Sequence, residues 1–242
     1  MRSVIILLLL ISSLQTYSQF NDSVHYHVYY GSTGIINKTN DGNSFVLNNA
    51  LRFNISKKIM TLNFSNSYVY GEQQNRKTNN DFSSTIDFDI YKNIQKLYYW
   101  GLGTFDKSYS LKINRRYQVG AGVGYTFLKT ETVDFVISDG IIYERSAVEK
   151  ADNTEDNYGT FRNSARLKYR WVIKDLLIFE GVSFLQNSLS DKNDYILKSN
   201  NNASIKLRKW LNFTTAVNYN KLSKTQRENL LITFGLTMET YF

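Results

Sequence analysis

The chain has 242 residues, with no Cys and no Pro, and its 29 Lys and Arg residues outnumber its 21 Asp and Glu residues, a net charge of +8. The absence of Cys excludes disulfides, thiolate metal sites, Cys nucleophiles and a lipid anchor on Cys. Because His25 and His27 are the only two His residues, a metal site would be built largely from carboxylates, and we expect no metal and no cofactor.

The N-terminal residues form the pattern of an export signal. Met1-Arg2-Ser3 is a short positive segment, the run from Val4 to Leu14 is almost wholly apolar, and small residues precede Gln19. This pattern predicts a signal peptide over residues 1–18, cleaved after Ser18. The apolar run is shorter than the ~20 residues of a membrane-spanning helix; an uncleaved anchor helix is the alternative.

Residues 19–242 are predicted to form a single all-β domain. Helical periodicity is nearly absent, and segments of about ten residues alternate apolar and polar side chains, which places the two kinds on opposite faces of a sheet. Gly140 and Gly181 interrupt two of these segments and predict β-bulges. The twelve predicted strands are 23–37, 43–55, 60–71, 80–91, 97–105, 115–128, 133–145, 158–173, 176–187, 194–207, 211–220 and 229–242.

The alternation is clearest in the segments 158–173 and 229–242. In the first, Phe161, Leu167 and Trp171 share one face, while Arg162 and Arg166 share the other. In the second, apolar residues from Leu230 to Phe242 oppose Thr, Gly and Glu residues. A mean hydropathy of −0.37 would suggest a soluble protein, but alternation hides the apolar surface of a membrane barrel in this way.

The connections predict which sheet architecture the strands adopt. Short ones, such as 56–58 and 174–175, alternate with longer polar ones, such as 73–80 and 148–157. This is the pattern of outer-membrane barrels, with both termini on the periplasmic side. An open edge is forbidden in hydrocarbon, so we predict a transmembrane antiparallel up-and-down β-barrel of about twelve strands; a soluble β-sandwich is the alternative.

Aromatic residues next to the connections predict two membrane-facing girdles at different heights. A sandwich would show no such banding. The residues beside short turns are Tyr98, Trp100, Tyr169, Trp171 and Trp210, and those beside long loops are Tyr70, Tyr117, Tyr143, Tyr195 and Tyr219.

Several stretches resemble a known family. The export signal, which ends in Tyr-Ser-Gln, is similar to those of Bacteroidetes-type bacteria, and the terminal Phe242 resembles the signal that the outer-membrane barrel assembly machinery reads. The longer stretches are similar to the salt-induced outer-membrane proteins, a family of unknown function, which implies an outer-membrane barrel but transfers no functional residues. These stretches are YYWGLGTFDKSYSLKINRRYQVGAGVGY (98–125), ISDGIIYE (137–144), FRNSARLKYRW (161–171), LSDKNDYILKS (189–199) and NLLITFGLTMETYF (229–242).

Charged residues on the polar faces predict the chemistry of the interior. A basic lumen would attract anions, whereas charges that pair across strands would make a packed polar core, which we favour. The basic residues predicted to face inward are Arg162, Arg166, Lys168, Arg170, Lys198, Lys206 and Arg208, with Arg52 on the second strand. The acidic partners predicted are Asp87, Asp89, Glu144 and Glu180, with Glu239.

These features favour a monomeric barrel of a Gram-negative outer membrane, structural or stress-related, with at most a narrow passage. A small anion-leaning channel is the first alternative. A lipid-modifying enzyme is the second, but no catalytic residues are predicted, because His25 and His27 lie at the periplasmic end. The expected partners are outer-membrane lipid and the assembly machinery, and no nucleic acid, since the basic residues form no exposed patch.

Overall fold

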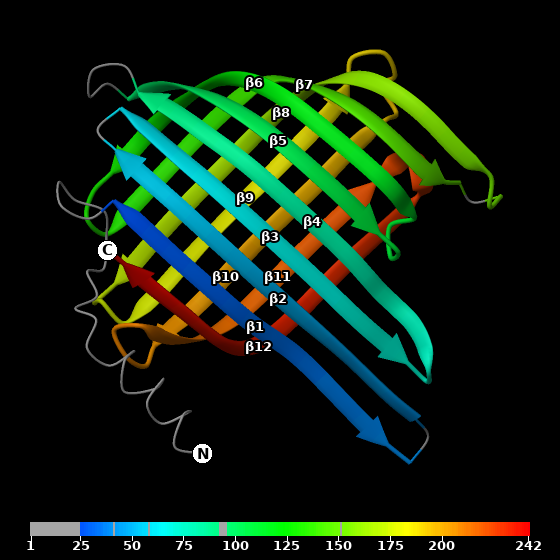
Figure 1. The fold of residues 1–242 in the computed structure, drawn as a ribbon, viewed down its shortest axis with the longest axis horizontal. Helices are drawn as coiled ribbons and strands as arrows, with labels where there is room; N and C mark the ends of the chain where they lie inside the picture. Colours follow the sequence, from blue (N-terminus) through cyan, green and yellow to red (C-terminus); the bar gives the residue numbers. More distant parts are fainter. Residues whose placement is uncertain (1–24, 41, 58, 92–95, 151) are drawn as a thin grey trace.

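The computed structural model describes residues 25–40, 42–57, 59–91, 96–150 and 152–242. These residues form twelve antiparallel strands and one short 3-10 helix, η1 (Ser223–Thr225), which confirms the predicted fold class (Figure 1). The predicted signal peptide, residues 1–18, lies outside the described residues. No helix within the described part of the chain is long and apolar enough to span a bilayer.

Most of the strands are longer than the sequence pattern predicts, mainly at the end away from the chain termini, whereas β1 and β10 are slightly shorter. Strand bounds are β1 (Tyr26–Thr39), β2 (Gly42–Lys57), β3 (Met60–Gln73), β4 (Arg76–Tyr91), β5 (Leu97–Ser108), β6 (Ile113–Lys129), β7 (Val133–Glu149), β8 (Glu155–Ile173), β9 (Leu177–Ser188), β10 (Tyr195–Lys206), β11 (Leu211–Leu222) and β12 (Arg227–Tyr241).

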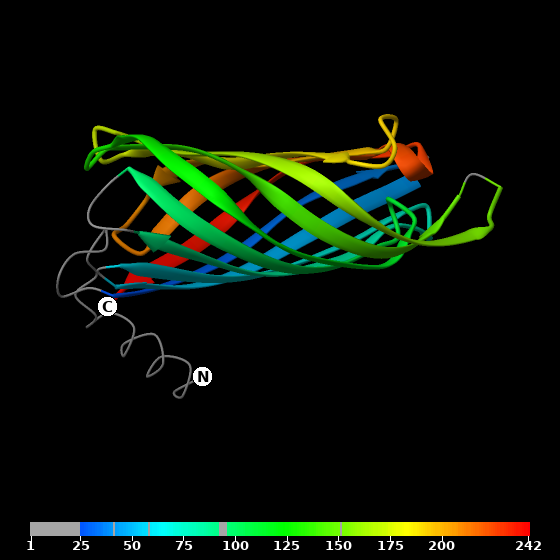
Figure 2. The same ribbon diagram turned by 90° about the horizontal axis from the view of Figure 1, so that it is seen from above.

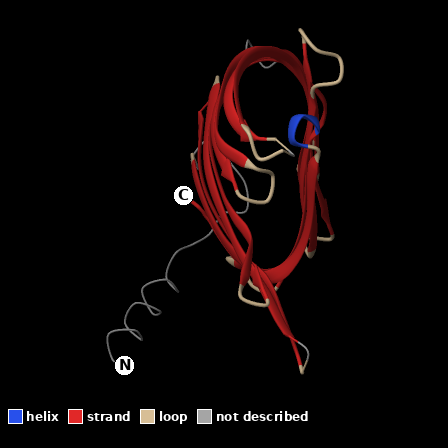
Figure 3. Ribbon diagram, turned by 90° about the vertical axis from the view of Figure 1, so that its right-hand side faces the viewer, coloured by secondary structure: helices blue, strands red, loops and turns tan. Residues whose placement is uncertain are grey.

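Each strand pairs with its neighbours in sequence, and β1 pairs with β12 to close the barrel. The closing ladder runs from His27 opposite Tyr241 to Gly34 opposite Phe234. At this seam a side chain on Gly235 would lie 2.1 Å from the Ser32 carbonyl oxygen, so only glycine permits the close approach of the strands. Seen along its axis, the barrel encloses an oval interior (Figure 3).

The outer surface is apolar over the middle of the strands. Val119 is 62% exposed, Leu230 is 61% exposed and Phe161 is 56% exposed, whereas inward neighbours such as Arg162 and Thr233 are fully buried. This inverts the arrangement of a soluble protein, and it stabilises the barrel only where hydrocarbon surrounds it. The barrel therefore spans a membrane, with its polar faces turned inward.

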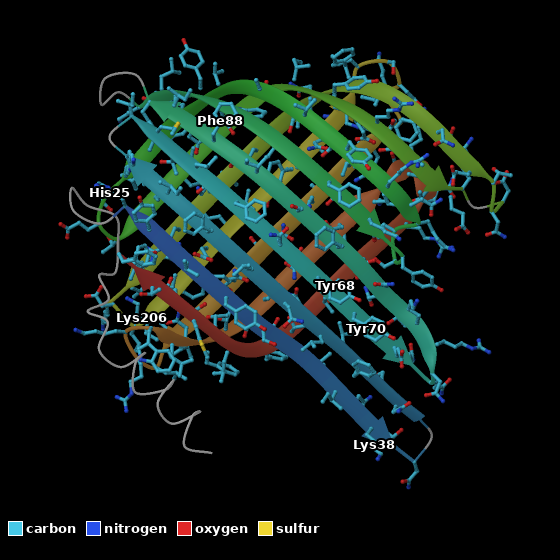
Figure 4. The ribbon with its side chains drawn as sticks, viewed as in Figure 1. His25, Lys38, Tyr68, Tyr70, Phe88 and Lys206 are labelled. Carbon is cyan, nitrogen blue, oxygen red and sulfur yellow. The ribbon has the colours of Figure 1, made fainter. Side chains whose placement is uncertain are left out.

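The two ends of the barrel differ in their connections. One end, called the terminal end here, holds His25, Phe242 and the turn that follows Lys206; the other, the loop end, holds the tip of the β1–β2 hairpin at Lys38 (Figures 2 and 4). The predicted long loops at the loop end are mostly wrong. The segment 73–80 is a two-residue turn at Gln74 and Asn75, both with positive φ, and β7 and β8 extend into the predicted loop 148–157. The connection 189–194 lies close to the loop predicted over 188–193.

The predicted bulges at Gly140 and Gly181 are also wrong. The register is constant through both positions, and the irregularities lie at Gly71/Glu72, Asp106/Ser108, Ile113/Arg115 and Thr126/Leu128. These two glycines instead make room for rings. A side chain on Gly140 would meet the Trp100 ring at 2.5 Å, and one on Gly181 would meet the Tyr169 ring at 2.7 Å.

The placement of two girdle aromatics is a further correction. Tyr98 and Trp100 point into the barrel and are 2% and 3% exposed, whereas Tyr99 faces outward and is 51% exposed. Tyr98 and Trp100 occupy space left by the inward glycines of β6, since a side chain on Gly122 would lie 2.6 Å from the Trp100 ring. Trp171, Tyr117 and Tyr143 face outward as predicted.

Candidate functional site

The interior of the barrel carries the charged residues that the sequence singles out. On β8, Arg162, Arg166, Lys168 and Arg170 share the inward face because they alternate with outward apolar residues. Arg162 is fully buried and Arg166 is 6% exposed, although both are cations. Charges buried this deeply need ionic and hydrogen-bonding partners.

The first buried group centres on Glu144 of β7, near the loop end. Its carboxylate accepts a 2.7 Å hydrogen bond from Arg162 Nε and 2.7 Å bonds from the hydroxyls of Ser146 and Tyr158. Gln118 donates a further bond at 2.8 Å, and Arg116 Nε lies 3.6 Å away. Glu144 is fully buried, so several donors replace the water that a carboxylate requires.

Asp194 extends this group from the connection between β9 and β10. Its carboxylate accepts two bonds from Arg162 Nη2, at 2.9 and 3.0 Å, and its carbonyl oxygen accepts one from Nη1 at 3.2 Å. The sequence analysis missed Asp194, because it made this residue the start of the strand 194–207, whereas β10 begins at Tyr195 and Asp194 lies in the connection before it. Arg162 is therefore clamped between a strand and a loop.

The second group surrounds Arg166 in the middle of the barrel. Its guanidinium donates to Asp87 Oδ2 at 2.9 Å and to Ser138 Oγ at 2.9 Å, and it lies 3.6 Å from Asp89. Asp87 and Asp89 belong to β4, and β5, β6 and β7 separate β4 from β8 in the closed sheet. This ion pair therefore crosses the interior of the barrel.

A third group crosses the interior toward the terminal end. Arg52 Nη1 of β2 lies 2.9 Å from Glu180 Oε1 of β9, and the Arg52 guanidinium covers the Tyr29 ring at 4.5 Å. Arg170 lies 4.0 Å from the same carboxylate, and Asn202 donates to it at 3.3 Å. The side chains of Arg52 and Glu180 are 36% and 27% exposed, so this level is less tightly packed.

A fourth crossing joins β10 to the β4–β5 side. Lys198 Nζ lies 3.5 Å from Asp106 Oδ1 and 3.4 Å from Ser83 Oγ, which itself donates to Asp106 at 2.6 Å. Asp106 was assigned to a predicted loop, but it lies on β5 and faces inward. Alternation would not have found it, because Asp106 shares a face with Tyr98 and Trp100, which were predicted to face the membrane.

The remaining predicted basic residues differ in placement. Lys168 faces the interior on β8 and is exposed there. Lys206 is the last residue of β10 at the terminal end (Figure 4). Arg208 is a correction, because it lies in the turn between β10 and β11 and is exposed, so it does not line the lumen.

The inward face carries acids as well as bases. Besides the acids already named, Asp81 accepts bonds from Ser108 and Ser110 near the loop end, and Glu239 lies 3.4 Å from His27 Nε2 near the terminal end. Basic side chains thus face carboxylates in each of the groups described above. Focusing of anions requires an electrostatic potential of a single sign. These residues do not produce such a potential, because acids and bases are mixed.

The two His residues lie at the terminal end, as predicted. His27 stacks on the Tyr241 ring at 4.1 Å and approaches Asn54 Oδ1 at 3.3 Å, and His25 Nδ1 lies 3.1 Å from the Ser56 carbonyl oxygen. Among the described residues, no three His, Cys, Asp or Glu side chains come together as metal ligands would.

The C-terminal Phe242 continues the closing ladder. Its carbonyl oxygen accepts bonds from the backbone of Tyr26 at 2.8 Å and of His25 at 3.1 Å. Its ring stacks on the Tyr26 ring at 5.6 Å, and the side chain is 55% exposed on the outer face.

Solved structures with a similar chain path include a translocator domain, an outer membrane channel and a porin. No curated protein matches the sequence. The translocator domain of the autotransporter NalP from Neisseria meningitidis is 12% identical, with a TM-score of 0.47 and 88% of each chain covered. An outer membrane channel from Pseudomonas putida F1 is 12% identical, with a TM-score of 0.49, and covers 95% of this chain and 99% of its own. The NanC porin is 10% identical, with a TM-score of 0.49, and covers 90% of this chain and 99% of its own.

A family model matches most of the sequence. The match extends over residues 32–239, so it includes nearly all of the barrel and the four charge groups of its interior. The family is described only as a protein of unknown function, and this description assigns no role to any of the residues above. The chain belongs to the DUF481 family.

Proposed function

We propose that this protein is an outer-membrane β-barrel of a Gram-negative bacterium, exported by the signal peptide over residues 1–18. Its role is structural or stress-related, as in the salt-induced proteins that its sequence resembles, and its polar interior is at most a narrow passage. The terminal end faces the periplasm and the loop end faces outside. We further propose that the barrel is a monomer, that Phe242 is its assembly signal and that it is not an enzyme.

The observation that carries the proposal is the ion pair between Arg166 and Asp87. It joins β8 to β4 through the interior at 2.9 Å, and the Arg52–Glu180 and Lys198–Asp106 pairs cross at other strands. Side chains that meet in the middle obstruct a barrel of this size, whose interior is intermediate between filled and channel-forming barrels.

Planar-bilayer recording of the refolded chain tests this proposal. The wild-type protein is expected to show no discrete single-channel conductance. The double variant Arg166→Ala/Asp87→Ala, which removes both ends of one crossing, is expected to conduct. Asp139→Leu/Asn163→Leu is the matched control, since both residues face outward, and it should stay silent. Steady conductance of the wild-type protein contradicts the proposal.

An anion-leaning channel is the second candidate, favoured by Lys168, which is exposed to the interior, and by Lys206 at the terminal end. The anion-leaning channel predicts that the wild-type protein conducts, with a reversal potential in a salt gradient that is shifted toward the equilibrium potential of the anion. The variant Lys168→Gln is expected to lose this shift. A lipid-modifying enzyme predicts lipid hydrolysis that His25→Ala abolishes, and equal absence of hydrolysis in both proteins removes it.

A further inference from the structure

The outer face of the barrel carries a groove of about 1070 Å³ over strands β3 to β8. Small residues lie among large ones along its length. Ser84, Gly103 and Gly159 leave it hollow, and Phe105, Tyr117 and Tyr143 stand beside them. A side chain on Gly103 would meet only Ile86, at 3.1 Å, so the hollow over this strand is open.

One end of this outer groove is basic. Arg115 of β6 and Arg145 of β7 line it, and both are exposed on the outer face. Within the described part of the chain, neither guanidinium lies within ion-pair distance of a carboxylate. Some other cations at the loop end are paired, as Lys112 is with Glu149 at 2.9 Å and Lys221 is with Glu228 at 3.8 Å.

The carboxylate of Glu155 leaves the donors of Arg115 available. Glu155 attracts Arg115 at longer range, but its two carboxylate oxygens accept 2.8 Å bonds from the amides of Asn114 and Asn157. Arg145 lies opposite Gly159 on β8 and opposite Tyr117 on β6. Both guanidinium groups can therefore offer bidentate hydrogen bonds to an anion that lies against the barrel wall.

The other end of the outer groove is apolar and lies deeper in the membrane. Phe64 and Ile86 are 40% and 49% exposed there. Phe64 is close to the start of β3 at the terminal end, whereas Arg115 is close to the start of β6 at the loop end. The groove thus runs from the hydrocarbon region to the membrane interface at the loop end. Its apolar end matches the acyl chains of a lipid, and its cationic end matches an anionic head group.

The width of the groove indicates how many acyl chains its ligand carries. It crosses six strands, which at ~4.8 Å between neighbours is wider than a single acyl chain. Arg115 and Arg145 are near neighbours on adjacent strands, so both guanidinium groups can bind one phosphate group. We propose that this groove binds a multiply acylated glycolipid of the outer leaflet, with one of its sugar phosphates on Arg115 and Arg145 and its acyl chains between Phe105 and Phe64.

Native mass spectrometry of the refolded full chain tests the inference. The probes are diphosphoryl lipid A, its dephosphorylated form and phosphatidylglycerol, each offered in detergent micelles. Wild-type protein is expected to retain diphosphoryl lipid A over the other two. Arg115→Gln/Arg145→Gln should weaken that binding by about tenfold or more, as loss of charge-assisted contacts does, and Lys221→Gln, on the far β11, should not.

A second variant tests the apolar end. Gly103→Leu fills the hollow and is expected to reduce retention of both forms of lipid A, whatever their phosphorylation. Equal retention by wild-type protein and the arginine double variant overturns the inference, as does equal binding of phosphatidylglycerol. So does a dimer that Gly103→Leu disrupts, because a second barrel would then cover the groove. The inference rests on the proposed outer-membrane location, but these readouts are independent of conductance.

Discussion

Arg166 of β8 holds its guanidinium over the indole ring of Trp100 on β5, 5.3 Å from the ring centroid. The same group donates to Asp87 and lies near Asp89 on β4. A planar cation can stack on a ring and bind a carboxylate in the same geometry, which lysine cannot. Arg166 thereby ties the aromatic packing of β5 to the acids of β4.

Removal of this cation should therefore destabilise the barrel. Arg166→Leu leaves Asp87 and Asp89 close together without their counter-ion, and a loss of about 3–5 kcal/mol in the free energy of unfolding is expected. Lys168→Leu, on the same face of β8 but exposed to the interior, is expected to change it by less than about 0.5 kcal/mol. Urea titration in lipid vesicles measures both. Equal effects would show that Arg166 is solvated rather than paired.

Two inward carboxylates, Glu144 and Glu180, should contribute differently to the free energy of unfolding, because they are buried to different extents. Glu144→Gln removes the charge that compensates Arg162 and Arg116 at a fully buried site, so a loss of about 3–5 kcal/mol is expected. Glu180→Gln removes a charge from a partly exposed pair, where a loss of at most about 1 kcal/mol is expected. Unfolding midpoints of the two variants in the same vesicles make the comparison. A larger loss for Glu180→Gln contradicts the burial described here.

The inward aromatics provide a third prediction. A side chain on Gly124 would lie 2.2 Å from the Tyr98 ring, so Gly124→Ala is expected to cost about 1–3 kcal/mol through overpacking. Shortening the ring in Gly124→Ala/Tyr98→Leu should restore part of this loss. Gly159→Ala is the control, because its side chain would meet only the flexible Tyr143 hydroxyl closely, at 2.8 Å. Thermal unfolding in detergent measures all three, and an absence of rescue contradicts this contact.

The orientation of Tyr98 and Trp100 could not be predicted from their own strand. Residues 98–102 are Tyr-Tyr-Trp-Gly-Leu, so both faces are apolar and alternation gives no signal. The signal for their orientation lies in the neighbouring strand. Gly120, Gly122 and Gly124 share one face of β6 and leave room for large rings on the inward face of β5. The faces of β8 and β12 were predictable because apolar and polar residues alternate there, with Asn163 the exception on β8.

The charge pairs illustrate a different limit. Alternation placed Arg166 and Asp87 on inward faces, but it contains no information on which residues meet across the interior. That depends on the tilt and stagger of the strands in the closed barrel. Asp194 was missed for another reason: the prediction made it the first residue of a strand, whereas it lies in a loop that only the fold brings to Arg162.

A carboxylate on the lipid-facing surface of β7 leads to the last prediction. Asp139 lies near the middle of the strand, is exposed on the outer face, and accepts bonds from Asn163 Nδ2 at 2.9 and 3.1 Å. An acid in hydrocarbon destabilises a barrel, although by less than the ~2–4 kcal/mol of Lys or Arg at the midplane. The amide of Asn163 offsets part of that penalty by donating to the carboxylate.

The single and the double variant should consequently change the free energy of unfolding in opposite directions. Asn163→Leu leaves the carboxylate without its donor and is expected to lower the free energy of unfolding by about 1 kcal/mol. Asp139→Leu/Asn163→Leu replaces both by apolar side chains and is expected to raise it by about 1 kcal/mol, since lipid then meets only hydrocarbon. Ile137→Leu, on the same face of β7, is the neutral control. If the double variant is less stable than the wild-type protein, Asp139 contacts a polar partner in the membrane rather than lipid.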